Sequence, residues 1–162
     1  MTPASPALED PRDDVTLGSK LLGDLCVPTS QIYTFRNGIY GFPGAHTFAL
    51  LPTDRDGLFW LQSLDNEALT FLLVDPFHFV EGYSVDLDAG ELAGLGPDDP
   101  AEILVLATLT LPSGNDQPTT VNLKGPIAMN VVRRLGRQLV VESEYGLRHP
   151  IDLGRKPAAS DL

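Results

Sequence analysis

The chain has 162 residues, 43% hydrophobic and 20% charged, which is typical of one globular domain and excludes a disordered chain. Its formal net charge is −11, and no Lys or Arg occurs from Asp56 to Asn122. Such a one-sided charge repels nucleic-acid phosphates and attracts basic proteins. The composition therefore argues against direct nucleic-acid binding. The acidity then has two interpretations: it serves solubility alone, or it attracts a basic partner protein.

The sequence contains no feature of an exported or membrane-bound protein. Cys26 is the only cysteine, so no intrachain disulfide can form, and a reducing compartment is the simpler interpretation. The first fourteen residues lack the apolar region of a signal peptide. The longest unbroken apolar run, 103–107, is far shorter than the roughly 18 residues that a membrane-spanning helix needs. We therefore expect a cytoplasmic protein that does not contact a membrane.

The two ends of the chain differ in composition from the middle. Residues 1–14 are rich in Pro, Asp and Ala and show no hydrophobic periodicity, and residues 154–162 are similar. Both ends are expected to be flexible tails, the first of them acidic. The folded part is then a single domain that covers residues 15–153.

Alternation of apolar and polar side chains dominates this domain and indicates β-strands. In chain order, we predict strands at 31–35, 58–61, 69–74, 102–111, 121–131 and 138–141, with Gly125-Pro126 interrupting the fifth. Helix signals are short, namely Asp75 before Pro76 and Asp88 before residues 89–95. Many short strands with few short helices predict an all-β, mainly antiparallel fold, either a small barrel or a sandwich.

The sequence contains no motif with the spacing of a catalytic or metal site. His46, His78 and His149 are isolated from one another, and neither Cys-x-x-Cys, His-Glu-x-x-His nor Gly-x-Ser-x-Gly occurs. The segment from Asp86 to Asp88 begins like a calcium loop but lacks the distal glutamate, so helix capping by Asp88 is favoured. We expect no catalytic residue, no metal and no other cofactor.

Several side chains are instead candidates for contacts with a partner protein. Phe42 either closes one end of the barrel or anchors an interface. Asn122 and Asn130 lie on the less apolar face of a strand, where each either hydrogen-bonds loop backbone inside the protein or contacts a partner. The remaining candidates are acidic residues near an aromatic pair: Asp75, Glu81, Asp86 and Asp88, with Phe77 and Phe79.

Five short segments follow one another along the chain in a recognisable order. They are Phe-Arg-Asn-Gly-Ile-Tyr-Gly-Phe-Pro-Gly at 35–44, Phe-Trp-Leu-Gln-Ser-Leu at 59–64, Val-Asp-Pro-Phe-His-Phe at 74–79, Thr-Val-Asn-Leu-Lys-Gly-Pro-Ile at 120–127 and Tyr-Gly-Leu-Arg-His-Pro-Ile at 145–151. Together they resemble the FliW family of bacterial flagellar assembly factors. The resemblance covers about residues 17–151, nearly the whole expected domain.

The resemblance implies a compact β-barrel-like fold and a regulatory role. Family members bind CsrA, a small dimeric translational repressor, and relieve its repression of flagellin mRNA. They also bind flagellin, which couples flagellin synthesis to secretion. An acidic surface would complement the basic patches that an mRNA-binding protein must carry. The alternative is a small acidic β-barrel that binds a small ligand or carries an unrecognised hydrolase site, which requires a deep pocket lined by convergent polar groups.

Overall fold

β-Strands dominate the part of the chain that the computed structural model describes, which is residues 14–153 except 88, 89, 91, 113, 115, 116, 142 and 143. The strands are β1 (Asp14–Ser19), β2 (Gly23–Pro28), β3 (Ile32–Thr34), β4 (Thr47–Pro52), β5 (Leu58–Ser63), β6 (Thr70–Val74), β7 (Ile103–Thr110), β8 (Thr120–Val121), β9 (Ile127–Asn130), β10 (Leu135–Gln138) and β11 (His149–Pro150). Among the described residues, helical structure is limited to α2 (Pro76–Phe79) and the 3-10 turns η2 (Thr29–Gln31) and η3 (Pro100–Glu102). The all-β prediction is confirmed.

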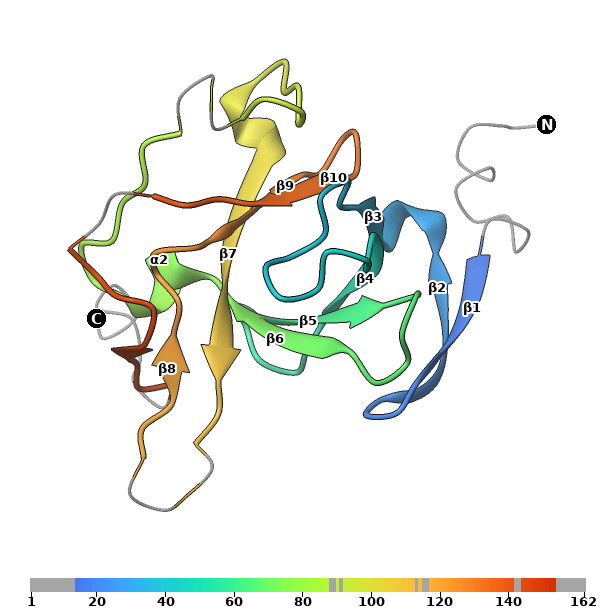
Figure 1. Cartoon of the computed structure of the whole chain (residues 1–162), viewed down its shortest axis with the longest axis horizontal. Coiled ribbons are helices and arrows are strands. Elements are labelled where there is room, and N and C mark those ends of the chain that lie inside the picture. Colours follow the sequence, from blue (N-terminus) through green and yellow to red (C-terminus); the bar gives the residue numbers. More distant parts are fainter. Residues whose placement is uncertain are drawn as a thin grey trace.

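Seven of these strands close into a barrel. Their order is β7-β6-β5-β4-β3-β10-β9, and β9 pairs with β7 to complete the ring. Among the described residues every strand pairing is antiparallel except that of β3 with β10, where Thr34 lies opposite Leu135. β7 crosses the middle of Figure 1 and pairs on both of its sides. Closure removes the exposed edges that an open sheet would leave, and it confirms the predicted mainly antiparallel barrel.

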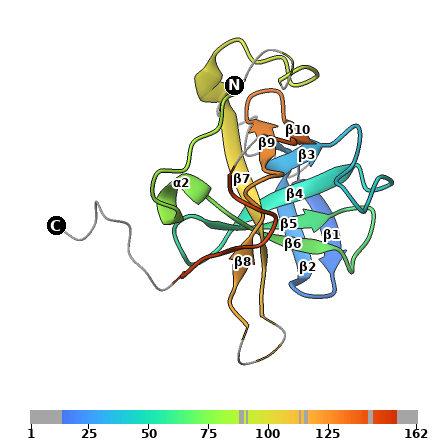
Figure 2. The same ribbon diagram turned by 60° about the vertical axis from the view of Figure 1, so that its left-hand side comes forward.

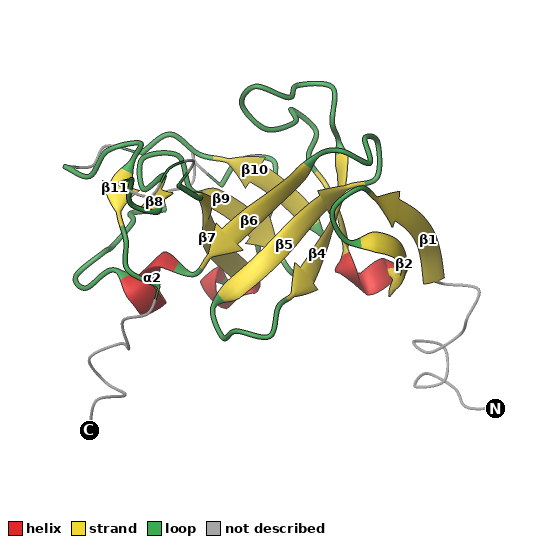
Figure 3. Ribbon diagram, turned by 90° about the horizontal axis from the view of Figure 1, so that it is seen from below, coloured by secondary structure: helices red, strands yellow, loops and turns green. Residues whose placement is uncertain are grey.

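Two additions flank the barrel at opposite ends (Figures 1 and 3). At one end the β1–β2 hairpin packs Leu17 and Val27 against Ala49 of β4. At the other end β8 pairs with the last residues of β7 and with β11, and α2 lies beside them. Figure 2 shows β8 continuing alongside the lower part of β7. The first strand begins at Asp14, which pairs with Pro28.

β7 separates two apolar clusters, which explains why both of its faces are apolar. Leu106 points into the barrel interior, where it packs with fully buried side chains that include Phe35 and Phe48. Ala107 faces the second cluster, below α2, together with Val121 and Leu123. A strand between two cores buries alternate residues on each side, so its sequence is apolar throughout.

The structure differs from the prediction around Gly125-Pro126. The predicted strand 121–131 is divided, because β8 ends at Val121 and β9 begins only at Ile127. Asn122 Oδ1 accepts hydrogen bonds from the N–H groups of Lys124 (3.1 Å) and Gly125 (2.9 Å), which turns the chain there. Pro126 has no N–H for a ladder bond. The predicted strand 138–141 is also displaced, since β10 covers Leu135–Gln138 and shares only Gln138 with it.

Candidate interaction surfaces

Helix α2 begins at Pro76 and is capped by Asp75, as the sequence predicts. Asp75 Oδ1 accepts a hydrogen bond from the backbone N–H of Phe77 (3.0 Å), and Pro76 occupies the first helical position, where a missing N–H is harmless. The Asp75 side chain is half-buried. Its carboxylate therefore holds the start of α2, and the following residues carry the exposed groups.

An aromatic row extends from α2 to the segment before β11. The Phe77 ring lies 5.4 Å from Tyr83, Tyr83 lies 5.5 Å from Tyr145, and Tyr145 lies 5.1 Å from His149, measured between ring centroids. The Tyr83 hydroxyl donates a hydrogen bond to Leu123 O (3.0 Å), which ties the row to the core. Phe77 is 50% exposed, so the row presents an apolar group to solvent.

Acidic side chains lie beside this row. Glu81 and Asp152 are exposed and line a pocket of about 300 Å³ together with Tyr145 and His149. We call Phe77, Glu81, Tyr145, His149 and Asp152 the acidic–aromatic surface. Phe77 and Glu81 are predicted from the sequence, whereas Tyr145, His149 and Asp152 are not, because the pairing of β11 with β8 brings them into place. That pairing spans only two residues, so its signal in the sequence is weak.

The two other aromatic candidates are partly engaged in packing. Phe79 is half-buried against the cluster below α2, and its ring lies over Gly57, where a Cβ would come within 2.9 Å of Phe79 Cε2. Phe42 packs edge-to-face on Phe71 of the barrel wall, with ring centroids 5.6 Å apart, and remains 41% exposed. The loop at Phe42 therefore covers part of the barrel core while leaving one side of its ring accessible.

The two asparagines hydrogen-bond loop backbone. Asn130 is fully buried: its Nδ2 donates to Leu95 O (2.9 Å), and its Oδ1 accepts from the N–H groups of Val132 (2.9 Å) and Arg133 (3.0 Å). Asn122 is half-buried and turns the chain before Pro126. These contacts match the intramolecular alternative that the sequence left open. Asp86 is exposed, and Asp88 lies outside the described residues.

The described ranges contain neither a candidate metal cluster nor a candidate membrane-spanning helix. No three His, Cys, Asp or Glu side chains gather closely enough there to hold a metal ion. No helix in the same part of the chain has the length and apolarity to cross a membrane.

Comparison with known proteins identifies the family. A family model described as FliW protein matches residues 16–151. The chain belongs to the FliW family. It is 36% identical over 138 residues to the flagellar assembly factor FliW of Natranaerobius thermophilus, covering 83% of this chain and 91% of that protein. It is 40% identical over 131 residues to that of Moorella thermoacetica, covering 80% and 83%.

A solved structure supports the same assignment. The crystal structure of the flagellar assembly factor FliW matches this fold with a TM-score of 0.76 and 32% sequence identity. The match covers 84% of this chain and 96% of that chain. The FliW resemblance inferred from the five sequence segments is therefore confirmed, and so is the fold that it implied.

The tyrosine at the centre of the aromatic row should make this FliW fold sensitive to alkali. Burial, and secondarily Tyr145 beside it, raise the pKa of Tyr83 to about 12 from its usual 10. Between these values the unfolded chain loses the Tyr83 proton and the folded chain keeps it, so the free energy of unfolding falls as pH rises. Urea unfolding of the wild type at about pH 9 and about pH 11.5 should show this loss.

The Tyr83→Phe variant is the control for alkaline sensitivity. It removes the titrating hydroxyl, so its stability should decline less between the two pH values than that of the wild type. Some decline should remain, because burial also raises the pKa of Tyr33. An equal decline in both proteins would contradict the role assigned to Tyr83.

Proposed function

We propose that this FliW-family chain binds the translational repressor CsrA, relieves its repression of flagellin mRNA, and also binds flagellin. The two partners would exchange on the protein, so that flagellin synthesis follows flagellin secretion. The proposal places the protein in the cytoplasm and has it work by binding, without catalysis or cofactor. Besides family membership, the observation that carries it is the acidic–aromatic surface.

The chemistry of that surface supports a basic protein partner. Glu81 and Asp152 lie beside Tyr145, and the half-exposed ring of Phe77 is a suitable apolar anchor. No Lys or Arg occurs from Asp56 to Asn122, the stretch that contains Phe77 and Glu81, while Arg148 stands between the surface residues Tyr145 and His149. An mRNA-binding protein carries basic patches, and complementary charge accelerates the encounter of two proteins. A central aromatic group with charged neighbours is also the usual anatomy of an interface.

Charge reversal at this surface should slow CsrA association. We expect the double variant Glu81→Lys/Asp152→Lys to lower the association rate constant for the cognate CsrA by about tenfold at low salt. The difference should shrink as ionic strength rises, because exposed charges are screened beyond about 10 Å at 0.1 M salt. Biolayer interferometry over a salt series measures both effects.

A matched control distinguishes the effect of charge at this surface from the effect of the net charge of the chain. Asp14 and Asp24 are both exposed on the β1–β2 hairpin, at the opposite end of the barrel from α2. The variant Asp14→Lys/Asp24→Lys changes net charge by the same amount and should leave most of the association rate intact. Equal slowing by both variants would place the CsrA contact elsewhere. Absence of binding to both cognate CsrA and flagellin at low salt would overturn the proposed function.

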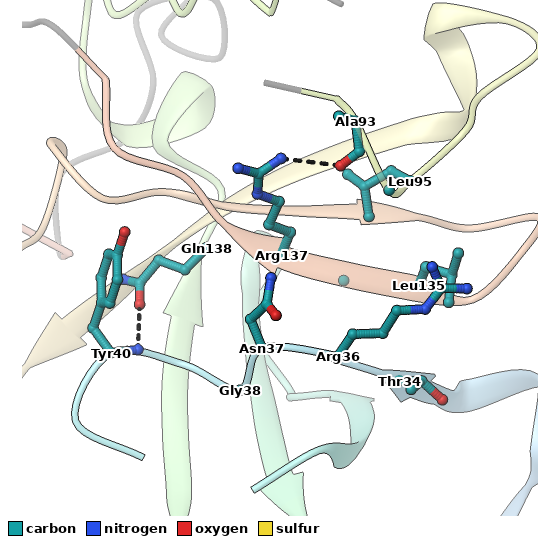
Figure 4. A pocket seen from close by; sticks show the side chains of 12 residues that line it. Thr34, Arg36, Asn37, Gly38, Tyr40, Ala93, Leu95, Leu135, Arg137 and Gln138 are labelled. Atoms are coloured by element: carbon teal, nitrogen blue, oxygen red, sulfur yellow. Dashed lines mark hydrogen bonds between the residues drawn. The ribbon is translucent and has the colours of Figure 1, made fainter. Parts of the chain in front are cut away.

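The pocket beside β10 gives no support to the hydrolase alternative, whereas the pocket at the acidic–aromatic surface does contain His149, Glu81 and Asp152. A pocket of about 370 Å³ lies between β10, the segment 34–40 and the segment 93–95 (Figure 4). Its described lining contains no Ser, Cys, His, Asp or Glu, so it offers no general base for activating a nucleophile. Its polar groups come chiefly from Arg36, Asn37, Arg137 and Gln138, which suggests binding of an anion instead.

A further inference from the structure

Four arginines gather around the β9–β10 hairpin of this acidic protein. Arg36 and Arg137 line the pocket of about 370 Å³, and in Figure 4 Arg137 extends from β10 toward Ala93 while Arg36 extends toward Leu135. Arg133 and Arg134 form the turn between β9 and β10. The backbone O of Arg134 accepts a hydrogen bond from Thr34 N (3.0 Å), which joins the turn to the β3 segment that leads to Arg36. We call these four residues the arginine face.

The contacts of the arginine face leave part of its charge available. Arg137 donates a hydrogen bond to Ala93 O (3.0 Å), which holds its guanidinium at the pocket wall. Arg133 lies 3.7 Å from the carboxylate of Asp98, and both side chains are largely exposed, so that ion pair is weak. Arg36 is exposed and makes no hydrogen bond or ion pair with any described residue. The face therefore remains net positive over the described residues in a chain of net charge −11.

The β9–β10 turn, which carries Arg133 and Arg134 of this face, is held rigidly by hydrogen bonds. The buried Asn130 side chain accepts two backbone hydrogen bonds from the turn and donates one to Leu95 O. The backbone N–H of Arg134 donates to Asn130 O (2.7 Å), which closes the turn. A turn fixed in this way loses little further conformational entropy when a partner binds it.

The residues in the turn are unusual for a loop with no partner. Val131 and Val132 are 41% and 58% exposed, so the turn presents adjacent apolar side chains to solvent. Arg134 has φ of 55°, the only positive φ of a non-glycine residue in the described chain. Glycine would adopt this conformation without strain, whereas an arginine there is better explained by the use of its side chain.

We propose that the arginine face, with Val131 and Val132, docks an acidic segment of a partner protein. Carboxylates of that segment would pair with the guanidinium groups, which bind them in a two-point geometry, and an apolar side chain would cover the valines. Nucleic acid is a poorer match, because its continuous charge would extend beyond this face into the negative field of the remaining surface. This proposal does not rest on the proposed function, since it concerns another face and the opposite partner charge.

Peptide titration of the full chain, labelled with ¹⁵N, tests the docking face. The probe is a blocked peptide of sequence Glu-Leu-Asp-Glu-Leu-Asp, and its neutral counterpart is Gln-Leu-Asn-Gln-Leu-Asn. At low salt the acidic peptide should shift amide signals of 34–40, 93–95 and 131–138, and the neutral peptide should not. No shifts at millimolar acidic peptide, or equal shifts with the neutral one, would overturn the proposal.

Paired variants establish whether the face or the overall charge binds the peptide. Arg36→Glu/Arg134→Gly removes charge from the face, and glycine suits the φ of residue 134. It should weaken binding at least about tenfold. Arg55→Glu/Arg148→Ala makes the same change in net charge at exposed sites outside the pocket and should bind normally. Equal weakening by both variants would refute the assignment, as would stronger shifts at the same amides with a single-stranded RNA oligonucleotide.

Discussion

Replacing Asn130 with alanine is expected to lower the free energy of unfolding by about 3 kcal/mol. The substitution deletes three hydrogen bonds at once: one to Leu95 O and two from the backbone N–H groups of Val132 and Arg133. Each is worth about 1 kcal/mol, and a buried group left without a partner costs more. Leu95 is almost fully buried, so water cannot easily replace the lost donor. Urea unfolding followed by circular dichroism measures the change.

Asn122→Ala is the matched comparison for this prediction. Asn122 also accepts two hydrogen bonds from backbone N–H groups at a turn, but it is half-buried and water can reach the turn. We expect a loss of about 1 kcal/mol, so the difference between the variants reports the burial of Asn130. If the free energy of unfolding falls equally in the two variants, the buried hydrogen bond to Leu95 O adds no stability beyond that of the turn.

Asn130→Asp separates the two roles of the Asn130 amide. The carboxylate can still accept hydrogen bonds from the N–H groups of Val132 and Arg133. It also places a negative charge next to Leu95 O, and the two oxygens repel each other. At neutral pH this variant should be at least as unstable as Asn130→Ala, because an unpaired buried charge is more costly than a lost hydrogen bond. The wild-type asparagine therefore joins the β9–β10 turn to the segment at Leu95, and it supports the arginine face through that link.

Local sequence patterns predicted the elements that depend on neighbouring residues. β5, β6 and β7 follow from runs of β-forming residues, and α2 follows from Asp75 before Pro76. β4 was missed because it shows no alternation: Phe48 and Leu50 face the barrel core, while Ala49 lies under the β1–β2 hairpin. A strand covered on both faces cannot be told from other buried apolar runs by its period alone.

Contacts between segments that lie far apart in the chain could not be predicted from the sequence. The barrel closes through the parallel pairing of β3 with β10, where Thr34 meets Leu135, and no local signal specifies that contact. The same closure brings Arg36 and Arg137 to one pocket, so the arginine face could not be read from a chain of net charge −11. The part of the acidic–aromatic surface near α2 was predictable because its residues are close in sequence.

Replacing Gly136 with alanine should also destabilise the protein strongly, by about 3 kcal/mol. Gly136 lies in β10, and a Cβ there would clash with three ring atoms of Phe35, including Cζ. Phe35 is fully buried and packs edge-to-face on Phe48, with ring centroids 5.2 Å apart, so the ring has no free space to move into. The clash lies at the β3–β10 seam and opposes barrel closure directly. Differential scanning calorimetry and urea unfolding both measure the loss.

Two further variants test whether the clash with Phe35 is the cause. Gly44→Ala makes the same substitution where nothing lies within 4 Å of the new Cβ, and it should change the free energy of unfolding by less than about 1 kcal/mol. Phe35→Leu makes room at residue 136, so the double variant Phe35→Leu/Gly136→Ala should be more stable than the sum of the single losses predicts. If the losses in free energy of unfolding simply add, the clash with the Phe35 ring is not the cause of the destabilisation. A favourable coupling would show that β10 requires glycine because Phe35 of the β3 segment fills the space a side chain would take.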